Sequence, residues 1–206
     1  MPLVRKPTTT GPARSPSAAD VSTSLGSANP DERWAAARAA AELPDAAPAL
    51  AAALSREPDA RVREAMFTSL ARIATRDEIR LILPLLRSND AALRMGALDA
   101  LRSSAMIARE ALSQLLSDPD ADVRTLSCEL ARSLPSEEAS RTLCALLTHE
   151  SEVNVCAAAI EVLAEVGDPG ALPALAQCAQ RLSQAPFLSF AIEVATKRIT
   201  AAGLRG

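Results

Sequence analysis

The residues of this sequence that could do chemistry are four cysteines and a single histidine, and their spacing gives them no common site. The cysteines are Cys128, Cys144, Cys156 and Cys178, and no two of them form a CxxC pair. A zinc site needs about four converging nitrogen or sulfur ligands, and His149, alone in a loop beside acidic residues, does not complete one. We therefore expect reduced and mostly buried thiols, no metal and no cofactor.

Catalysis by a nucleophile has as little support. Cys156 stands where other segments of the chain carry an arginine, as described below, and it could be more accessible than the other cysteines, but nothing near it in the sequence supplies a base. The chain has only seven glycines and no HExxH, GxGxxG or nucleophile-elbow motif. No catalytic residue is predicted, and a non-enzymatic role is favoured.

The elements that position these residues are predicted to be helices. Nearly half of the residues are apolar (49%) but only 2% are aromatic, so the core must consist of Ala, Leu, Val and Ile. Alanine is the best helix former, and the sequence lacks the long alternating runs of β-branched residues that build strands. An all-α fold is therefore expected.

Five segments of the sequence resemble one another from residue 29 onward, at intervals of 30 to 32 residues. Each opens with a residue whose side chain can cap a helix, and these openers are Asn29, Asp59, Asp90, Asp120 and Glu152. Four residues later the fifth segment has Cys156, and the first four carry Arg33, Arg63, Arg94 and Arg124. Residues that recur in every repeat normally serve the stacking of repeats, so we assign the openers and the arginines a structural role.

Each repeat is predicted to contain two helices. The first follows the opener for about 12–14 residues, with apolar residues at helical spacing. The second comes after a break, and the second helices are expected at 48–56, 78–88, 106–117, 137–148 and 171–183. A closing helix at about 187–201 has no partner after it, so it is expected to cap the C-terminal end or to begin a sixth repeat.

The pattern D-x-x-V-R-x-x-A, followed by a turn and A-L-x-x-L, resembles the short HEAT-like repeat of the phycobilisome-lyase type. The residues that carry it are Asp59/Val62/Arg63/Ala65, Asp90/Leu93/Arg94/Ala97, Asp120/Val123/Arg124 and the turn Gly167-Asp168-Pro169. The resemblance implies a right-handed α-solenoid of about five two-helix repeats with a C-terminal capping helix. It leaves the activity open, because lyases, scaffolds and regulatory subunits share this repeat.

Two parts of the chain are expected. Residues 1–28, rich in Pro, Ser and Thr, are predicted to be a disordered tail, and residues 29–206 the solenoid domain. A short docking peptide near Pro2–Pro7 or Arg14–Pro16 is the alternative interpretation of the tail. The sequence shows neither a signal peptide nor a long apolar stretch, and its basic residues are almost all arginine, so a bacterial cytoplasmic protein without membrane contact is expected.

The second helices of such repeats usually line the concave face of the solenoid. When they are aligned, charged and amide side chains fall into rows that indicate either a solvated charge ladder or a partner-binding stripe. The candidates for this stripe are Arg80, Arg109, Glu110, Gln114, Glu138, Arg141 and Gln177. Trp34 aligns with Glu64 in a slot expected to face solvent, and it is interpreted either as a cap over the N-terminal end or as a contact for a partner.

Three functions follow, in order of preference. The first is a non-catalytic scaffold or adaptor that holds another protein on its concave surface. The second is a bilin (tetrapyrrole) lyase or isomerase, which the resemblance alone suggests and which would need a cleft with convergent polar residues. The third is a DNA-binding solenoid, disfavoured by the formal charge of −3 and the scarcity of aromatic residues. Nucleic acid and small-molecule ligands are accordingly not expected.

Overall fold

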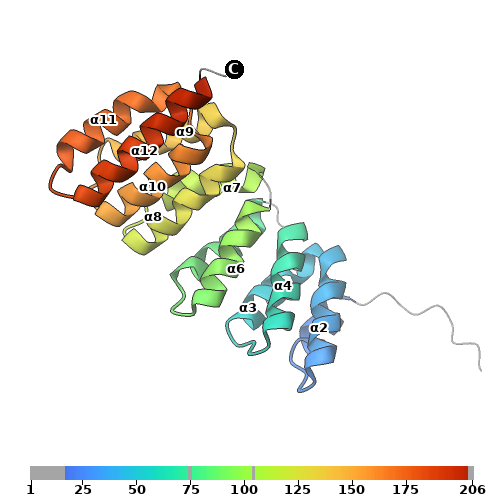
Figure 1. The fold of residues 1–206 in the computed structure, drawn as a ribbon. Coiled ribbons are helices and arrows are strands. Elements are labelled where there is room, and N and C mark those ends of the chain that lie inside the picture. The colour runs from blue at the N-terminus through green and yellow to red at the C-terminus, as the bar shows by residue number, and fades with distance from the viewer. Residues whose placement is uncertain (1–16, 74–75, 104, 204–206) are drawn as a thin grey trace, which may run out of the picture.

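The structure is a computed structural model that describes residues 17–73, 76–103 and 105–203. Within these ranges every regular element is helical. The helices pair in repeats that follow one another along an elongated molecule, from α2 in blue to α12 in red (Figure 1). This is the α-solenoid that the sequence predicts.

The helices lie where the repeat pattern places them. The first helices of the repeats are α2 (Pro30–Ala39), α4 (Ala60–Ile73), α6 (Ala91–Arg102), α8 (Ala121–Cys128) and α10 (Val153–Val166). The second helices and the closing helix are α3 (Ala47–Leu54), α5 (Arg76–Ile82), α7 (Ala105–Leu115), α9 (Ser136–Leu147), α11 (Leu172–Arg181) and α12 (Pro186–Gly203). Short 3-10 segments adjoin them at η1 (Ala40–Glu42), η2 (Pro44–Ala46), η3 (Leu83–Arg87), η4 (Glu129–Ser133) and η5 (Pro169–Ala171).

Helical structure is present earlier in the chain than the sequence predicts. Helix α1 (Ala18–Ser24) lies inside the segment 1–28 that was expected to be a disordered tail. Val21 and Leu25 are 2% and 7% exposed, because this i, i+4 pair packs with α1 onto the first repeat. Because most residues of this segment are polar or small, the sequence does not predict that these two apolar side chains are buried. Residues 1–16, with the two candidate docking peptides, lie outside the described residues.

The helix starts are capped as expected in four repeats. The side chains of four openers each accept the backbone amide two residues later, at 2.8–2.9 Å, and these are Asn29, Asp59, Asp90 and Asp120. The fifth opener, Glu152, makes no such bond. Glutamate is not among the favoured caps. The carboxylate of Glu150 accepts the amide of Glu152 itself at 2.8 Å, as Glu57 and Asp118 accept the amides of the openers Asp59 and Asp120.

The second helix expected at 78–88 is shorter than predicted. α5 ends at Ile82 and the chain continues as η3. Pro84 lies at the start of η3, where it has no amide to donate and its ring obstructs an α-helical turn. The α-helical spacing of the apolar residues therefore does not extend the α-helix past Ile82.

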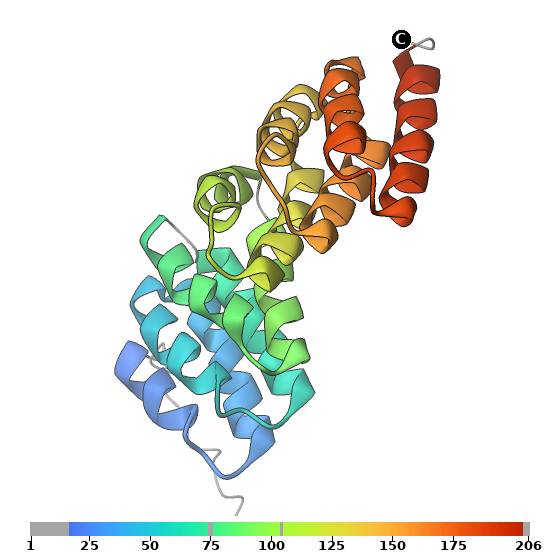
Figure 2. The same ribbon diagram turned by 90° about the vertical axis from the view of Figure 1, so that its left-hand side faces the viewer.

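The first helices form one layer and the second helices the other, which Figure 2 shows from the side. In the first layer α2 packs on α4, α4 on α6, α8 on α10 and α10 on α12. Between α6 and α8 the contact instead runs through η4, which follows α8. The hydroxyls of Thr125 and Ser127 donate to carbonyl oxygens one turn back in α8, at 2.8 and 2.6 Å, a pattern that bends helices.

The core lies between the two layers and is aliphatic, as the composition predicts. Its largest fully buried side chains are nearly all leucines, for example Leu50, Leu70, Leu101 and Leu143. None of the helices in the described part of the chain has both the length and the apolar character needed to cross a bilayer.

Candidate interaction surfaces

The arginines that recur in the repeats lie between repeats and hold the loops. Arg33 forms a two-bond ion pair with Glu57, at 2.7 and 2.8 Å, and Arg124 pairs in the same way with Glu150, at 2.7 and 3.2 Å. The side chains of Glu57 and Glu150 are only 3% and 5% exposed. These two pairs are nearly buried and link each first helix to the loop that precedes the next repeat.

The remaining two arginines that recur in the repeats, Arg63 and Arg94, also bind loop or opener residues, but with different partners. Arg63 reaches the next opener, Asp90, at 2.7 Å. Arg94 donates to the backbone carbonyl of Ser88 at 2.7 Å. All four guanidinium groups therefore serve contacts within or between repeats.

The loop residues that bind Arg33, Arg94 and Arg124 form a column that the repeat pattern did not reveal. They stand two residues before the openers, at Ser27, Glu57, Ser88, Asp118 and Glu150. Their backbone carbonyls accept arginine side chains in three repeats, at 2.7–2.9 Å from Arg33, Arg94 and Arg124. The sequence does contain a sign of this column, because a polar residue recurs at this position at the same 30–32-residue interval as the openers.

The ion pairs set the charge states of the buried carboxylates. The hydrogen bond from Arg33 holds the pKa of Glu57 below its ordinary value. At Glu150 burial favours a higher pKa, but the hydrogen bonds from Arg124 and from two backbone amides outweigh it, and the pKa is lowered. Both carboxyl groups are therefore ionised at neutral pH, and each is hydrogen-bonded to its arginine.

In the fifth repeat the arginine comes from another helix. Cys156 takes the arginine position, and its thiol donates to the carbonyl of Glu150 at 3.5 Å. Arg181 on α11 donates to the carbonyl oxygens of Glu150 and Leu147, at 2.5 and 2.6 Å. The expectation that Cys156 is more accessible is wrong: it is 0% exposed. Its short side chain lies beside the 147–152 loop, whose carbonyl oxygens accept the hydrogen bonds of Arg181.

The cysteines and His149 are the remaining side chains that could take part in a reaction or bind a metal ion. All four cysteines are free, and only Cys144 is partly exposed. Burial raises the pKa of Cys128 to about 12, and the hydrogen bond with Cys178 together with burial raises the pKa of Cys156. Neutral thiols are poor nucleophiles. The hydrogen bond with Cys156 lowers the pKa of Cys178 to about 7, but the Cys178 side chain is fully buried. His149 is exposed, and within the described ranges no group of three or more His, Cys, Asp or Glu is placed to hold a metal ion.

The charged row predicted on the second helices is partly tied up between repeats. Arg109 on α7 and Glu138 on α9 form a two-bond ion pair, at 2.5 and 2.7 Å, which lowers the pKa of Glu138. Arg141 lies 3.9 Å from Glu137 on its own helix, and both side chains are exposed. This geometry agrees with the solvated charge ladder, which is one of the two interpretations of the row.

The rest of that row surrounds a small hollow or faces solvent. Arg80, Glu110 and Gln114 line a hollow of about 300 Å³ between α5 and α7. Gln177 is exposed on α11, away from this hollow. A partner-binding role for these side chains stays a prediction.

Trp34 lies between the first two repeats. The guanidinium carbons of Arg38 and Arg61 are 4.9 and 5.4 Å from the centroid of its ring, within the range of cation–π contacts. The ring is half-buried, not solvent-facing as expected, because Arg61 of the next repeat covers it. α1 rather than Trp34 packs on the N-terminal side of α2. Capping and partner contact both stay predictions for Trp34.

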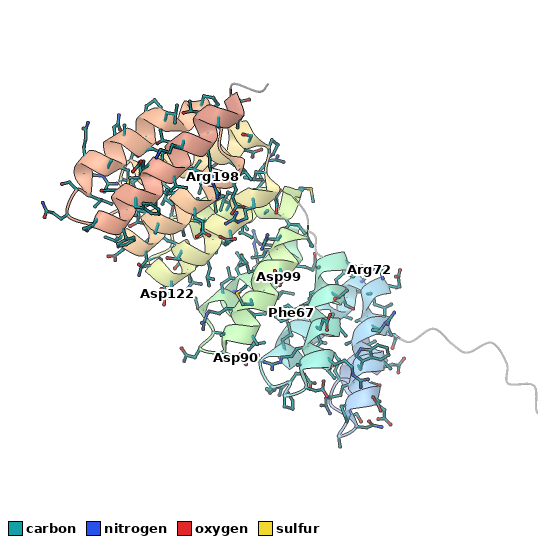
Figure 3. The ribbon with its side chains drawn as sticks, viewed as in Figure 1. Phe67, Arg72, Asp90, Asp99, Asp122 and Arg198 are labelled. Atoms are coloured by element: carbon teal, nitrogen blue, oxygen red, sulfur yellow. The ribbon has the colours of Figure 1, made fainter. Side chains whose placement is uncertain are left out.

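A groove that the sequence did not indicate runs between α4 and α6. It has a volume of about 770 Å³, and we call it the α4/α6 groove after the helices that line it with Arg63, Glu64, Phe67, Ala71, Arg72, Ala92, Met95, Gly96, Asp99 and Ala100. Figure 3 shows Phe67 and Asp99 where α4 and α6 face each other. Met95 is 47% exposed, which is unusual for a large apolar side chain in this molecule.

The floor of the α4/α6 groove depends on one glycine. A Cβ atom at Gly96 would lie 2.2 Å from Cε2 of Phe67, so no other residue fits there unless the ring moves. The missing side chain lets the aromatic ring lie against the backbone of α6. At the rim, Glu64 and Asp99 are exposed and have no ion pair or hydrogen bond with another side chain in the described part of the chain.

Several solved structures are similar to this chain in fold. Cex1p has a TM-score of 0.53 at 15% identity, and the match covers 91% of this chain but 44% of Cex1p. The archaeal HEAT-like repeats protein from Thermococcus onnurineus NA1 (16% identity, 90% and 88% coverage) reaches 0.46. The CpcE–CpcF phycocyanin lyase complex of Nostoc sp. PCC7120 (14% identity, 96% and 100% coverage) reaches 0.38. These likenesses concern the fold, and none bears on what the chain binds.

The sequence itself gives the family. No curated protein matches the chain in sequence. The family model for HEAT repeats matches residues 20–102 and 109–186, which is most of the chain, and its first match begins within α1. With its paired helices, its capped openers and its inter-repeat arginines, this chain belongs to the HEAT repeat family.

Proposed function

We propose that this chain is a non-catalytic protein-interaction module that holds a segment of another protein in the α4/α6 groove. The observation that carries the proposal is the groove itself, which combines an apolar floor, a half-exposed Met95 and two acidic rim side chains. Methionine is common at binding surfaces because its flexible side chain adapts to different partners. HEAT solenoids commonly serve as interaction scaffolds, which agrees with this role.

The chemistry of the groove defines the segment that fits. Phe67 and Met95 offer apolar contact, while Glu64 on α4 and Asp99 on α6 place negative charge on either side. The rim arginines Arg63 and Arg72 are engaged with acidic partners outside the groove. A segment with apolar side chains flanked by Lys or Arg is therefore the complementary partner.

The proposal places the binding surface on the first helices instead of the second. On the second helices the strongest charged pair, Arg109 with Glu138, already satisfies itself between repeats. A partner would have to break this pair to use either side chain. Glu64 and Asp99, at the rim of the α4/α6 groove, could bind a partner without first breaking an ion pair.

The test is affinity capture with the full chain and two sets of variants. Met95→Glu with Asp99→Lys changes the groove at exposed positions, and the matched control changes Arg80, Arg109 and Arg141 to Glu on the second helices. We expect the groove variant to lose partners that the control retains. Retention of all partners by the groove variant, or their loss from the control alone, contradicts the proposal.

A further inference from the structure

The two ends of the solenoid are finished differently. At the N-terminal end α1 packs on the first repeat and buries Val21 and Leu25. The last helix that the structure describes is α12, shown in red in Figures 1 and 2, and it packs on α10 and α11.

The outer face of α12 carries exposed aromatic side chains beside its charged residues. Its inner stripe, Leu188, Ile192, Ala195 and Ile199, is buried against the preceding helices. On the other side Phe187 and Phe190 are 53% and 70% exposed. These are two of the three phenylalanines in the whole sequence, so the exposed aromatic surface is concentrated on this helix.

The exposed residues continue along one stripe of α12. Phe187, Phe190, Val194, Lys197 and Ala201 follow one another at intervals of three or four residues, which places them on one side of a helix. Val194 is half-buried and the other four are exposed. We call these five residues the α12 outer stripe.

We infer that the α12 outer stripe binds the same stripe of a second copy of this chain, in an antiparallel two-fold pair centred near Val194. A two-fold interface uses the same patch on both subunits, so the stripe must complement itself. In the antiparallel register Phe187 of one copy faces Ala201 of the other, a large side chain against a small one. Phe190 lies beside Lys197 of the second copy, which is a cation–π arrangement.

The charges on α12 favour this antiparallel register over a parallel one. A parallel pair would place Lys197 against Lys197 of the other copy, two like charges on the outer stripe. The antiparallel pair separates them and brings the aromatic ring of Phe190 to each. Glu193 already bonds to Lys197 on the same helix at 2.5 Å, so the lysine brings its own counter-charge into the interface.

The size of the stripe predicts a weak dimer. The 18 residues of α12 form a helix about 27 Å long. One helix pair of this length buries less than the roughly 800 Å² per partner of a standard stable complex. The dimer should therefore dissociate on dilution within the micromolar range.

The first experiment measures the mass of the full chain by analytical ultracentrifugation over a dilution series. We expect the wild type to rise from 21.5 kDa towards twice this value with concentration. Phe190→Glu should remain monomeric. The matched control, Met106→Glu, introduces the same charge at another exposed apolar side chain, on α7, and should behave as the wild type does. Circular dichroism confirms that each variant is folded.

Two outcomes of this experiment would overturn the inference. A wild type that remains at 21.5 kDa at every concentration shows that the stripe does not pair. Loss of association in Met95→Glu as well as in Phe190→Glu shows that α12 docks into the α4/α6 groove of the next copy, a head-to-tail contact. The inference is independent of the proposed function, because Met95 contributes only to the groove.

The second experiment tests the register directly. In a Cys144→Ala background, Val194→Cys places a thiol near the two-fold axis, and oxidised glutathione should join two copies through a disulfide. Thr196→Cys lies about 200° further round the helix and should not cross-link. Equal cross-linking of both variants, or of neither in a chain that dimerises, contradicts the antiparallel register.

Discussion

Arg124 shows at the scale of one residue how the repeats are joined. Its guanidinium bonds to both carboxylate oxygens of Glu150 and to the carbonyl of Asp118, so one side chain links three points of two successive loops. Arg72, by contrast, pairs with Glu42 at the surface, where both side chains are more than half exposed. The two pairs involve the same chemistry in different surroundings.

Arg124→Ala should lower the free energy of unfolding by about 3 kcal/mol, because it leaves the carboxylate of Glu150 buried without a counter-charge. Arg72→Ala should cost less than about 1 kcal/mol, because water solvates Glu42 when its partner is removed. Urea denaturation followed by circular dichroism measures both. Equal effects of the two substitutions would show that the loop pair is not a buried one.

The lowered pKa values of Glu57 and Glu150 predict acid sensitivity. A carboxyl group whose pKa is lower in the folded chain stabilises the fold above its unfolded pKa, and this stabilisation disappears as the pH falls through the folded pKa. The free energy of unfolding should therefore be flat near neutrality and decrease below about pH 4.3. Glu57→Gln should reduce the slope of this decrease, and an unchanged slope would contradict the assignment.

At the scale of elements, α1 and the α4–α6 contact decide what the repeat pattern leaves open. α1 closes the first repeat with a two-residue apolar contact from a segment that reads as polar. Gly96 sets how closely α6 approaches α4, and with it the floor of the α4/α6 groove. Neither feature belongs to the repeat consensus.

Leu25→Ala should destabilise the chain by roughly 2–3 kcal/mol, because a buried leucine loses its contacts and leaves a cavity. Ser24→Ala, at the exposed neighbouring position, is the control and should change the midpoint of thermal unfolding very little. If the two variants melt together, residues 17–28 behave as the disordered tail that the composition suggested.

The effect of Gly96→Ala on stability is expected to be opposite in the wild-type chain and in a chain that lacks the Phe67 ring. In an exposed helix interior this substitution stabilises by about 1 kcal/mol, but here the added Cβ meets the ring of Phe67 and should lower the melting temperature. In a Phe67→Ala background the obstacle is gone, and Gly96→Ala should then raise the melting temperature. Calorimetry of the four chains gives the double-mutant cycle, and the same sign in both backgrounds would refute the close contact.

At the scale of the whole molecule, the described surface offers ion pairs, the α4/α6 groove and the exposed aromatic side chains of α12. The recurring arginines are engaged with loops, and the buried thiols Cys128 and Cys156 are neutral. The surface of the solenoid is therefore suited to holding other chains. It could bind along the first helices and pair with a copy of itself at its C-terminal end.

A linear tetrapyrrole added to the full chain should leave its own absorption spectrum unchanged at high concentration. The α4/α6 groove has an apolar floor and two carboxylates at its rim, which repel the propionates of a bilin. Spectral titration measures the effect, with serum albumin as a positive control for binding. A shifted and strengthened long-wavelength band would favour the lyase hypothesis instead.

Much of the fold was predictable because it depends on local interactions. The caps at Asn29, Asp59, Asp90 and Asp120 involve bonds two residues apart, and the apolar stripes involve spacings of three and four. Such patterns can be read directly from the sequence. They gave the repeat period, the helix pairs and the aliphatic core.

The surfaces were decided by the tertiary structure. The α4/α6 groove depends on the distance between two helices that begin 31 residues apart, at Ala60 and Ala91. The aromatic side chains of α12 are exposed because no described helix covers them. The replacement of the fifth arginine by Arg181 required knowing that α11 passes beside the 147–152 loop. Local spacing determines which face of each helix is apolar, whereas the packing of the repeats determines which apolar faces remain open to a partner.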